Sequence, residues 1–425
     1  MKILKFLISL SVFISFSANA LLEVNIIKSR EAAFPIVIAP FEVIGNSKNV
    51  DIAKIIRDNL NRSGQFNALS SEALISNQID FSFWQEHKKD AVVFGKIEQV
   101  SNKVYNVYIY IYDVFSEKSL YQKKIRVHNS GFRRIAHFLS DKIYYVLLGQ
   151  KGSFDTRLSY VTVSENSSGG RTYKLQISDS DGFNPQTVVR SSNPILSPAW
   201  SGDQKKLAYV SFKNNRSEVF VMTPFLKTIP IKLPKFDGIA SSPAWHPDGE
   251  SIALTISKNG NKDIYLYNIN SKKLKRLTKN ISIDTEASFS PNGDKIAFTS
   301  NRTGQVQVYI KDLKSKKISR ATFEGRYNAK PVFSPDGKDL ALIHRVGKDY
   351  RLALLDIASR DLTIMTQNKS DESPYFSPNG GMIIYSTNRD NKGILSIISL
   401  HNNQIVELMQ KEGEVREPSW SNYSN

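Results

Sequence analysis

The sequence predicts an α+β N-terminal domain followed by an all-β six-bladed β-propeller, and three observations carry this prediction. An aromatic residue recurs six times at intervals of 43 to 45 residues: Trp200, Trp245, Phe289, Phe333, Phe376 and Trp420. Four of these aromatics are followed by Ser or His, Pro, Asp or Asn, and Gly, a pattern that favours a tight turn between strands. Each repeat holds short alternating strands without helical periodicity, which is typical of propeller blades.

Composition indicates a globular protein whose positive charge is spread over its surface. The 425 residues carry a net charge of +17. Lysines and arginines occur throughout the turns and loops, with no basic helix or long basic run, so we expect diffuse solvated charge and no nucleic-acid site. The chain has no cysteine, which excludes disulfides and thiolate metal sites.

The first 20 residues have the pattern of a signal peptide. Lys2 and Lys5 precede an apolar stretch that is too short to span a bilayer, and Ala18-Asn-Ala20 forms a cleavage motif. We therefore expect an exported protein that begins at Leu21, with no membrane-spanning segment after it. At this start Leu22, Val24 and Ile26 alternate with polar residues, as in a strand of the next domain or in an edge that pairs with a partner. The pattern by itself favours the first of these.

Residues 21–150 are predicted to hold the α+β domain. A buried strand is expected at 34–39 and an amphipathic helix at 50–60, followed by three strands at 90–100, 105–114 and 120–128. A helix over 131–148 closes the domain, and Gly149 is its stop signal.

The propeller is expected to span residues 155–423 and to close on itself. Residues 157–163, 173–177 and 188–189 match the second, third and fourth strands of a blade that lacks its first strand. An orphan first strand, Pro418-Ser-Trp420-Ser, lies at the end of the chain. We predict that it completes this blade, because a closed ring leaves no sheet edge unpaired.

Motifs for catalysis are missing from the sequence. It contains no Gly-x-Ser-x-Gly elbow, no His-Glu-x-x-His, no Walker loop and no dinucleotide fingerprint. The six histidines are scattered, and Asp179-Ser-Asp-Gly182 is interpreted as an Asp-Gly turn because no downstream glutamate completes a calcium loop. We therefore expect a protein that is not an enzyme and has no cofactor or metal.

Charged residues gather where the chain approaches the innermost strands, which is one mouth of the central channel. A single carboxylate there would be a turn cap, but several that converge on a rigid scaffold suggest a binding site. The candidates are Asp284, Thr285, Glu286, Asp371, Glu372, Arg416 and Glu417. We expect Glu286 to lie desolvated beneath a partner and Asp371 to lie at the rim. If the binding face lies elsewhere, loops 301–304 and 388–391 are the alternatives.

Several segments resemble the TolB family, a periplasmic component of the Tol-Pal system of Gram-negative bacteria. They include Glu23-Val-Asn-Ile, Asp90-Ala-Val-Val-Phe-Gly95, Arg157-Leu-Ser-Tyr-Val161, Ile177-Ser-Asp-Ser-Asp-Gly-Phe-Asn184 and the closing Pro418-Ser-Trp420-Ser. Thr285-Glu286 and Asp371-Glu372-Ser373-Pro374 resemble the mouth loops of the family. Two features depart from the family pattern. Leu21-Leu22 precede the acidic residue that usually opens the mature chain, and Ser201-Gly-Asp replaces one Ser-Pro-Asp-Gly turn.

This resemblance implies a monomeric, non-enzymatic periplasmic hub. Its propeller mouth would bind the lipoprotein Pal, and its mature N-terminus, with Leu22, Glu23, Val24 and Ile26, would bind TolA. Such a hub would maintain outer-membrane integrity and support constriction of the envelope during cell division. Two alternatives stay open: a periplasmic propeller that binds a sugar or peptide ligand, and a propeller-type hydrolase without its catalytic domain.

Overall fold

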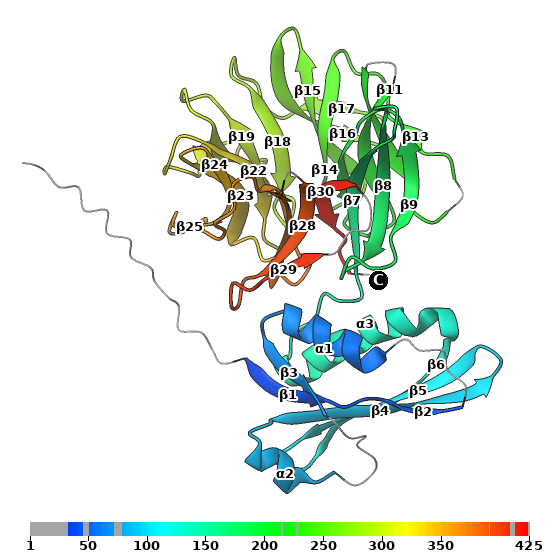
Figure 1. Ribbon diagram of the computed structural model, residues 1–425. Coiled ribbons are helices and arrows are strands. Elements are labelled where there is room, and N and C mark those ends of the chain that lie inside the picture. Colours follow the sequence, from blue (N-terminus) through cyan, green and yellow to red (C-terminus); the bar gives the residue numbers. More distant parts are fainter. Residues whose placement is uncertain are drawn as a thin grey trace, which may run out of the picture. The chain divides into compact units, whose positions relative to one another are not determined.

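The structure is a computed structural model, and it describes residues 33–45, 51–71, 79–213, 216–226, 228–390, 392–408 and 413–423. An α+β domain precedes six four-stranded sheets, which confirms the predicted fold class. Figure 1 shows the two parts in sequence colours. Within the described residues, no helix combines the length and the apolar character that a bilayer span requires.

The N-terminal domain is built on a six-stranded sheet with the strand order β3-β1-β4-β5-β6, in which β2 also pairs with β4. The strands are β1 (Phe34–Ile38), β2 (Glu42–Ile44), β3 (Phe66–Ser70), β4 (Ala91–Ser101), β5 (Val104–Asp113) and β6 (Ser119–His128). β1 runs parallel to β3 and β4, whereas β4, β5 and β6 form an antiparallel meander.

Two helices, α1 (Ile52–Arg62) and α3 (Phe132–Leu148), cover one face of this sheet (Figure 1). α1 begins at Asp51, whose carboxylate accepts a hydrogen bond from the Lys54 amide at 2.8 Å. Its buried isoleucines follow helical spacing and pack on the sheet. α3 follows the 3-10 turn η1 (Asn129–Gly131) and ends at Gly149, whose φ of 70° is readily available to glycine.

Three elements of this domain were not predicted: β2, β3 and the short helix α2 (Phe81–Glu86). β2 has only three residues and all are exposed, so it carries no alternation of buried and exposed positions. β3 forms through parallel pairing with β1, a tertiary contact that local sequence does not encode. α2 has no buried residue and therefore shows no apolar stripe.

The propeller consists of six antiparallel sheets, and the strands of each are named from the innermost to the outermost. Blade 1 holds β10 (Ile195–Trp200), β11 (Leu207–Lys213), β12 (Arg216–Met222) and β13 (Ile231–Lys232). Blade 2 holds β14 (Ile239–Trp245), β15 (Ser251–Lys258), β16 (Asn261–Asn268) and β17 (Leu274–Arg276). Blade 3 holds β18 (Asp284–Phe289), β19 (Lys295–Ser300), β20 (Gln307–Asp312) and β21 (Ile318–Arg320).

The second half of the ring repeats this order. Blade 4 holds β22 (Asn328–Phe333), β23 (Asp339–Val346), β24 (Asp349–Asp356) and β25 (Leu362–Ile364). Blade 5 holds β26 (Glu372–Phe376), β27 (Met382–Arg389), β28 (Lys392–Ser399) and β29 (Ile405–Leu408). Blade 6 holds β30 (Glu414–Trp420), β7 (Arg157–Glu165), β8 (Arg171–Asp179) and β9 (Gln186–Ser191).

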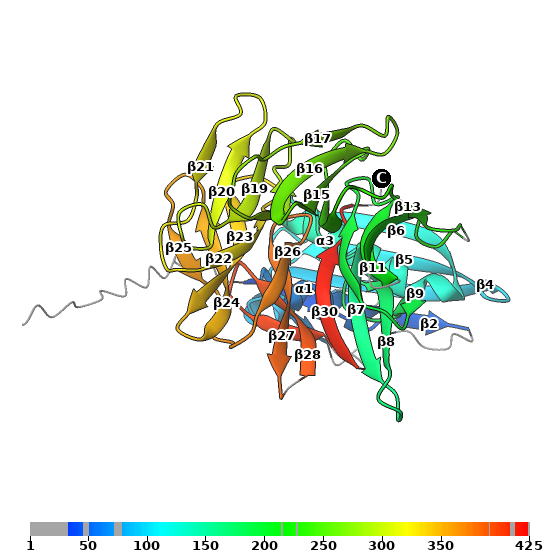
Figure 2. The same ribbon diagram turned by 90° about the horizontal axis from the view of Figure 1, so that it is seen from above.

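Blade 6 joins the end of the chain to the start of the propeller. β30 pairs antiparallel with β7, with Trp420 opposite Leu158, and Figure 2 shows the two strands side by side. The Trp420 side chain is buried, and its indole nitrogen donates a hydrogen bond to Thr156 Oγ1 at 2.8 Å. The first and last strands of the propeller are therefore held in one sheet.

The α+β domain and the propeller share an apolar cluster. Phe154 packs edge-on against Tyr144 of α3, with 5.9 Å between the ring centroids, and the cluster that contains both also includes residues of β7, β27 and β30. Polar contacts accompany it: Ser399 Oγ donates to the carbonyl of Ser63 at 2.7 Å, and the Asn379 amide donates to Ser153 Oγ at 3.2 Å. The first contact fixes the end of α1 against the turn between β28 and β29, and the second ties the segment after α3 to the turn between β26 and β27.

Candidate functional site

One residue in each innermost strand has a left-handed backbone, and it lies three positions before the recurring aromatic. These residues, named the bulge ring, are Ser197, Ser242, Glu286, Lys330, Ser373 and Glu417, with φ between 47° and 57°. At each of them the pairing with the second strand shifts register. Such bulges re-aim a side chain at a sheet edge. In this propeller they point six side chains into one central cavity.

The cavity has a volume of about 500 Å³ and runs from the bulge ring to the turns between the first and second strands. Proline follows the bulge residue in five blades, and Ala287 takes its place in blade 3. Below them lie the six recurring aromatics and the turn prolines, such as Pro247 and Pro291. The cavity wall therefore combines apolar and polar surface in similar amounts, with the bulge ring as a polar ring at one level.

Three members of the bulge ring carry charge, and each is tied to a neighbouring blade. Glu286 Oε2 accepts hydrogen bonds from Thr299 Oγ1 at 2.9 Å and from the Lys330 amide at 3.2 Å. Lys330 Nζ donates to Ser373 Oγ at 3.0 Å, and Glu417 accepts from the Ser197 amide. Burial raises the pKa of Glu417 and Glu372 adds to the effect, although Lys330 and the Ser197 amide oppose it. The ring is thus prearranged and can offer both carboxylate and ammonium groups to a ligand.

Two carboxylates expected at the mouth are turned into the blades instead. Asp284 is buried, and both of its oxygens accept from Arg302 Nη2, at 2.8 and 2.9 Å. Asp371, which was expected at the rim, is only 2% exposed and accepts from the Leu352 amide at 3.1 Å and from Asn368 Nδ2 at 3.0 Å. The prediction that both carboxylates are accessible at the mouth was wrong. They accept hydrogen bonds from buried donors of adjacent strands and loops, and the sequence around each carboxylate does not reveal those donors.

The remaining mouth candidates are more accessible. Thr285 Oγ1 lies 3.2 Å from Thr255 Oγ1 of blade 2, and Glu372 Oε1 is within 3.4 Å of Ser386 Oγ. Arg416 is exposed and forms an ion pair with Glu414 at 2.5 Å. In loop 301–304, Arg302 is committed to Asp284, and loop 388–391 is only partly described. Leu22, Glu23, Val24 and Ile26 lie outside the described residues.

Sequence reasoning selected Glu286 and Glu417 as contact residues and placed Lys330 and Ser373 in the mouth segments without selecting them, and it missed Ser197 and Ser242. The signal was present: each ring residue precedes the recurring aromatic by three positions, and in five blades a proline follows it. A left-handed non-glycine residue at one position of every repeat marks a built feature of the channel.

The comparisons with known proteins cover both domains. Family profiles match the TolB amino-terminal domain at residues 22–120 and the TolB beta propeller domain at residues 144–424. The chain belongs to the TolB family.

Individual members of the TolB family align over nearly the whole chain. The Tol-Pal system protein TolB of Ruthia magnifica subsp. Calyptogena magnifica is 60% identical and aligns over 96% of both chains. The TolB of Nitrosococcus oceani is 44% identical over 95% of this chain and 94% of its own length. The crystal structure of TolB from Acinetobacter baumannii superposes with a TM-score of 0.85 at 39% identity, covering 93% of this chain and 98% of that one.

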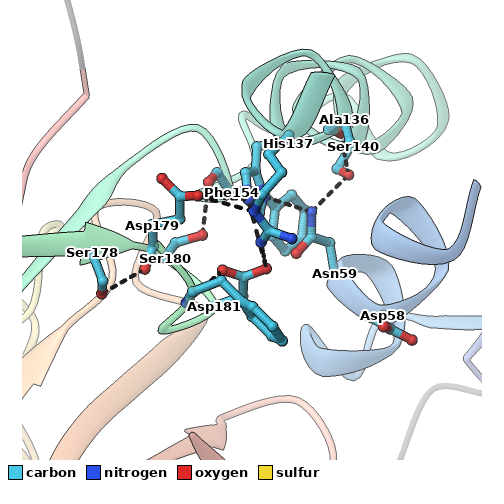
Figure 3. A network of polar contacts seen from close by, with 12 residues as sticks. Asp58, Asn59, Ala136, His137, Ser140, Phe154, Ser178, Asp179, Ser180 and Asp181 are labelled. Atoms are coloured by element: carbon cyan, nitrogen blue, oxygen red, sulfur yellow. Dashed lines mark hydrogen bonds and ion pairs between the residues drawn. The ribbon is translucent and has the colours of Figure 1, made fainter. Parts of the chain in front are cut away.

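A second polar cluster in this TolB-family chain joins α3 to the turn after β8 (Figure 3). His137 Nε2 lies 3.6 Å from Asp181 and 3.9 Å from Asp179, and these three ligand atoms are close enough to hold a metal ion. Arg133 bonds to both carboxylates, at 3.2 Å to Asp179 and 2.5 Å to Asp181, and Arg157 bonds to Asp179. Two guanidinium groups therefore already balance the two acids, and the cluster is an ionic link between the domains.

The imidazole of this cluster is held neutral. Asn59 Nδ2 donates to His137 Nδ1 at 2.9 Å, which leaves the ring proton on Nε2, facing Asp181. The pKa of His137 is lowered to about 3, chiefly by burial and also by the positive charges of Arg62, Arg133 and Arg157, against the opposing effect of Asp181. The Asp179-Ser-Asp-Gly182 segment forms a turn, as predicted, and the amide of Phe183 donates to Asp181 at 3.1 Å.

Proposed function

We propose that this chain is a periplasmic, non-enzymatic interaction protein of the Tol-Pal system. The observation that carries the proposal is the alignment at 60% identity with a Tol-Pal system protein over 96% of both chains, together with the order of the two TolB domains. Its signal-peptide pattern supports export. In this role it maintains outer-membrane integrity and supports constriction of the envelope during division.

The propeller mouth is the proposed site for the lipoprotein Pal. The proposed contact residues lie at or beside the bulge ring: Thr285, Glu286, Glu372, Arg416 and Glu417. Bonds within the blades do not occupy all of their polar atoms. Asp284 and Asp371 have a different task in this proposal: their buried bonds hold the mouth segments in shape. A preformed site of this kind loses little entropy on binding.

The mature N-terminus is the proposed site for TolA. Leu22, Val24 and Ile26 alternate with Glu23 and its neighbours, so an extended segment would present its apolar side chains on one side. Such a segment can add to a sheet edge of a partner, with main-chain hydrogen bonds for affinity and apolar pockets for specificity. The two partners would then bind at distant parts of the sequence.

Association without catalysis is part of the proposal. The cavity wall consists mainly of prolines, alanines, serines and aromatics. His246, which also lines it, packs edge-on against Phe289 and faces Asp248 at 3.0 Å across its own turn, so its environment is that of a turn residue. We propose no cofactor, and a monomer as the functional form.

Copurification tests this function. The tagged full-length chain is expressed in its own or a related bacterium, and envelope proteins that elute with it are identified by mass spectrometry. Pal and TolA are expected to coelute in amounts comparable with the bait. A sample in which neither protein exceeds its level in an untagged control would contradict the proposal, and elution with a sugar or peptide ligand alone would favour a ligand-binding propeller.

A further inference from the structure

Positive charge is concentrated on the outer hairpins of blades 2 and 3. Segments 269–276 and 313–320, each comprising the turn after the third strand and the whole fourth strand, contain eight lysine and arginine residues and no carboxylate. The equivalent segments of the other four blades contain at most two such residues each. The fold thus brings two lysine-rich turns to equivalent places in adjacent blades. We name six exposed lysines of these segments the basic rim: Lys272, Lys273, Lys275, Lys314, Lys316 and Lys317.

Carboxylates do not balance the basic rim within the described residues. None of its six lysines forms an ion pair there, whereas Arg276 beside them pairs with the buried Asp263 at 2.5 Å. Lys311 Nζ donates to a backbone carbonyl of blade 2 at 2.5 Å and so ties blade 3 to blade 2. Burial lowers the pKa of Lys311, and the charges of Lys275 and Lys316 add to this effect. The lysines of the two blades are therefore close enough to repel one another, which an anionic ligand would relieve.

A groove between blades 3 and 4 adjoins the basic rim and has a volume of about 600 Å³. Three cations line it, Lys295, Lys317 and Arg360, and none of them forms an ion pair within the part of the chain that the structure describes. The carboxylates in its lining, Asp312 and Asp336, each accept a hydrogen bond from an amide of their own turn, at 2.7 and 3.1 Å. The groove therefore offers lysine and arginine donors of the kind that bind phosphate oxygens.

The basic rim lies across the ring from the contacts with the N-terminal domain. Those contacts involve Ser399 and Asn379 of blade 5 and Asp179 of blade 6, and in a ring of six blades these stand opposite blades 2 and 3. Leu274, at 44%, is the one large apolar side chain exposed in the two hairpin segments, both of which the structure describes in full. An interface with a folded protein has an apolar centre, so the rim is better suited to a charged surface.

We propose that the basic rim and the adjoining groove bind the anionic headgroups of a phospholipid surface. Lysines spread over two blades match a surface that carries many phosphates, and the groove has room for a headgroup. Each basic residue close to such a surface strengthens binding about fivefold, and salt weakens the attraction. Such binding goes beyond the proposed function, because it requires neither Pal nor TolA.

Flotation with lipid vesicles tests this binding on the purified mature chain. Vesicles of phosphatidylethanolamine and phosphatidylglycerol are compared with vesicles of phosphatidylcholine alone. We expect the chain to float with the anionic vesicles at low salt, to be released as the salt concentration rises, and to stay unbound with the neutral vesicles. No flotation with the anionic vesicles, or equal flotation with both kinds, would overturn the proposal.

Charge reversals that change the net charge equally locate the binding surface. Lys273→Glu with Lys317→Glu alters equivalent positions of the rim. Lys262→Glu with Lys348→Glu alters exposed lysines at the hairpins between second and third strands, which lie at the other end of each blade. The first pair should weaken vesicle binding at least about tenfold and the second less than about twofold. Equal losses in chains with the wild-type melting temperature would mean that net charge alone attracts the chain, and would overturn the proposal.

A single substitution tests the groove. Arg360→Ser should weaken binding to the anionic vesicles about fivefold. Arg345→Ser is the control, because Arg345 is exposed at the other end of blade 4. Equal vesicle binding by the two variants would overturn the part of the groove in the proposal.

Competition separates a lipid surface from a free phosphate ligand. Glycerol 3-phosphate or sodium chloride is added, at matched ionic strength, to the chain bound to anionic vesicles. We expect equal release by the two, because the rim contacts an array of headgroups and not one phosphate. Release by glycerol 3-phosphate under conditions where sodium chloride leaves the chain bound would show a site for a free phosphate ester and overturn the lipid surface.

Discussion

Six single residues determine which side chains face the propeller channel. The bulge ring holds non-glycine residues at φ near 50°, a conformation that costs about 1 kcal/mol or more for each. The cost is offset by hydrogen bonds within and between blades: Glu286 accepts from Thr299 of its own blade and from the Lys330 amide of the next. Without the register shift, the side chain three residues before each aromatic would follow the regular alternation of the strand. The left-handed backbone at the bulge ring therefore determines which side chain of each innermost strand lines the channel.

His137 gives a residue-scale prediction about acid stability. The folded chain holds this residue neutral with a pKa of about 3, against an ordinary value of 6.5. Below pH 6.5 the unfolded chain therefore binds one more proton than the folded chain, so stability present at pH 7 is lost as the pH falls. The loss from this group amounts to about 2 kcal/mol at pH 5.

His137→Gln should remove this part of the pH dependence. We expect the free energy of unfolding to change less between pH 7.5 and pH 5 in the variant than in the wild type, by about 2 kcal/mol, as measured by urea denaturation at each pH. His128→Gln is the control, because His128 is exposed at the end of β6. If His137→Gln and the wild type lose equal stability over this range, the imidazole is not held neutral in the folded chain.

Among the elements, the loop between α1 and β3 meets the turn between β28 and β29 at Ser63 and Gly64. The φ of Gly64 is +73°, and a Cβ there would lie 2.4 Å from Ser399 Oγ and 2.5 Å from Asn402 Oδ1. Gly149, at the end of α3, has a φ of +70°, but a Cβ added to it would meet no atom within 4 Å. The two glycines therefore share the backbone requirement and differ only in their surroundings.

Gly64→Ala should destabilise the chain more than Gly149→Ala. Both substitutions should lose about 1–2 kcal/mol for the left-handed backbone, and only Gly64→Ala has to displace the turn of blade 5 as well. Thermal unfolding of the two variants checks the difference. Equal melting temperatures would mean that the contact between Gly64 and blade 5 is not formed in solution.

The C-terminal strand β30 gives a prediction about ring closure. Trp420 is fully enclosed by blade 6 and its neighbours, so Trp420→Ala should lower the free energy of unfolding by about 3–5 kcal/mol. Removal of residues 415–425 should have a larger effect, since it also leaves the edge of β7 unpaired. Trp420→Phe is the control, because it keeps most of the apolar volume and loses the bond to Thr156. A truncated chain with the melting temperature of the wild type would contradict closure by β30.

Elements with a repeated or periodic pattern could be predicted, and those fixed by tertiary contacts could not. The six aromatics located every innermost strand, and the buried spacing of α1 and α3 located both helices. β3 was not predicted, because it pairs in parallel with β1 and the whole of α1 lies between the two strands in the sequence. In the site, Asp284 and Glu286 lie two positions apart, and the sequence predicted the same role for both. Their different hydrogen-bond partners give them different roles: Asp284 accepts from Arg302, and Glu286 accepts from Thr299. These partners lie in the next strand and the hairpin that follows it, so the sequence around the two carboxylates does not reveal them.

At the scale of the whole molecule, recognition of two protein partners is proposed for separate parts of one chain. The propeller mouth, with the bulge ring, is the proposed Pal site. The proposed TolA segment precedes β1 in the other domain. Because the two sites share no residue, truncating one should leave the affinity of the other nearly unchanged. This independence is what would make the molecule a hub.

Pal and TolA are proposed to bind at different parts of this chain, and separate calorimetric titrations of the two proteins test this most directly. Each is titrated into the mature chain and into a chain that lacks residues 21–29, with the melting temperature of both chains as the control for folding. We predict that the truncation abolishes the heat of TolA binding and changes the Pal dissociation constant by less than about threefold, as expected for independent sites. Unchanged TolA binding, or a comparable loss of Pal binding by a truncated chain that melts as the wild type does, would contradict separate sites.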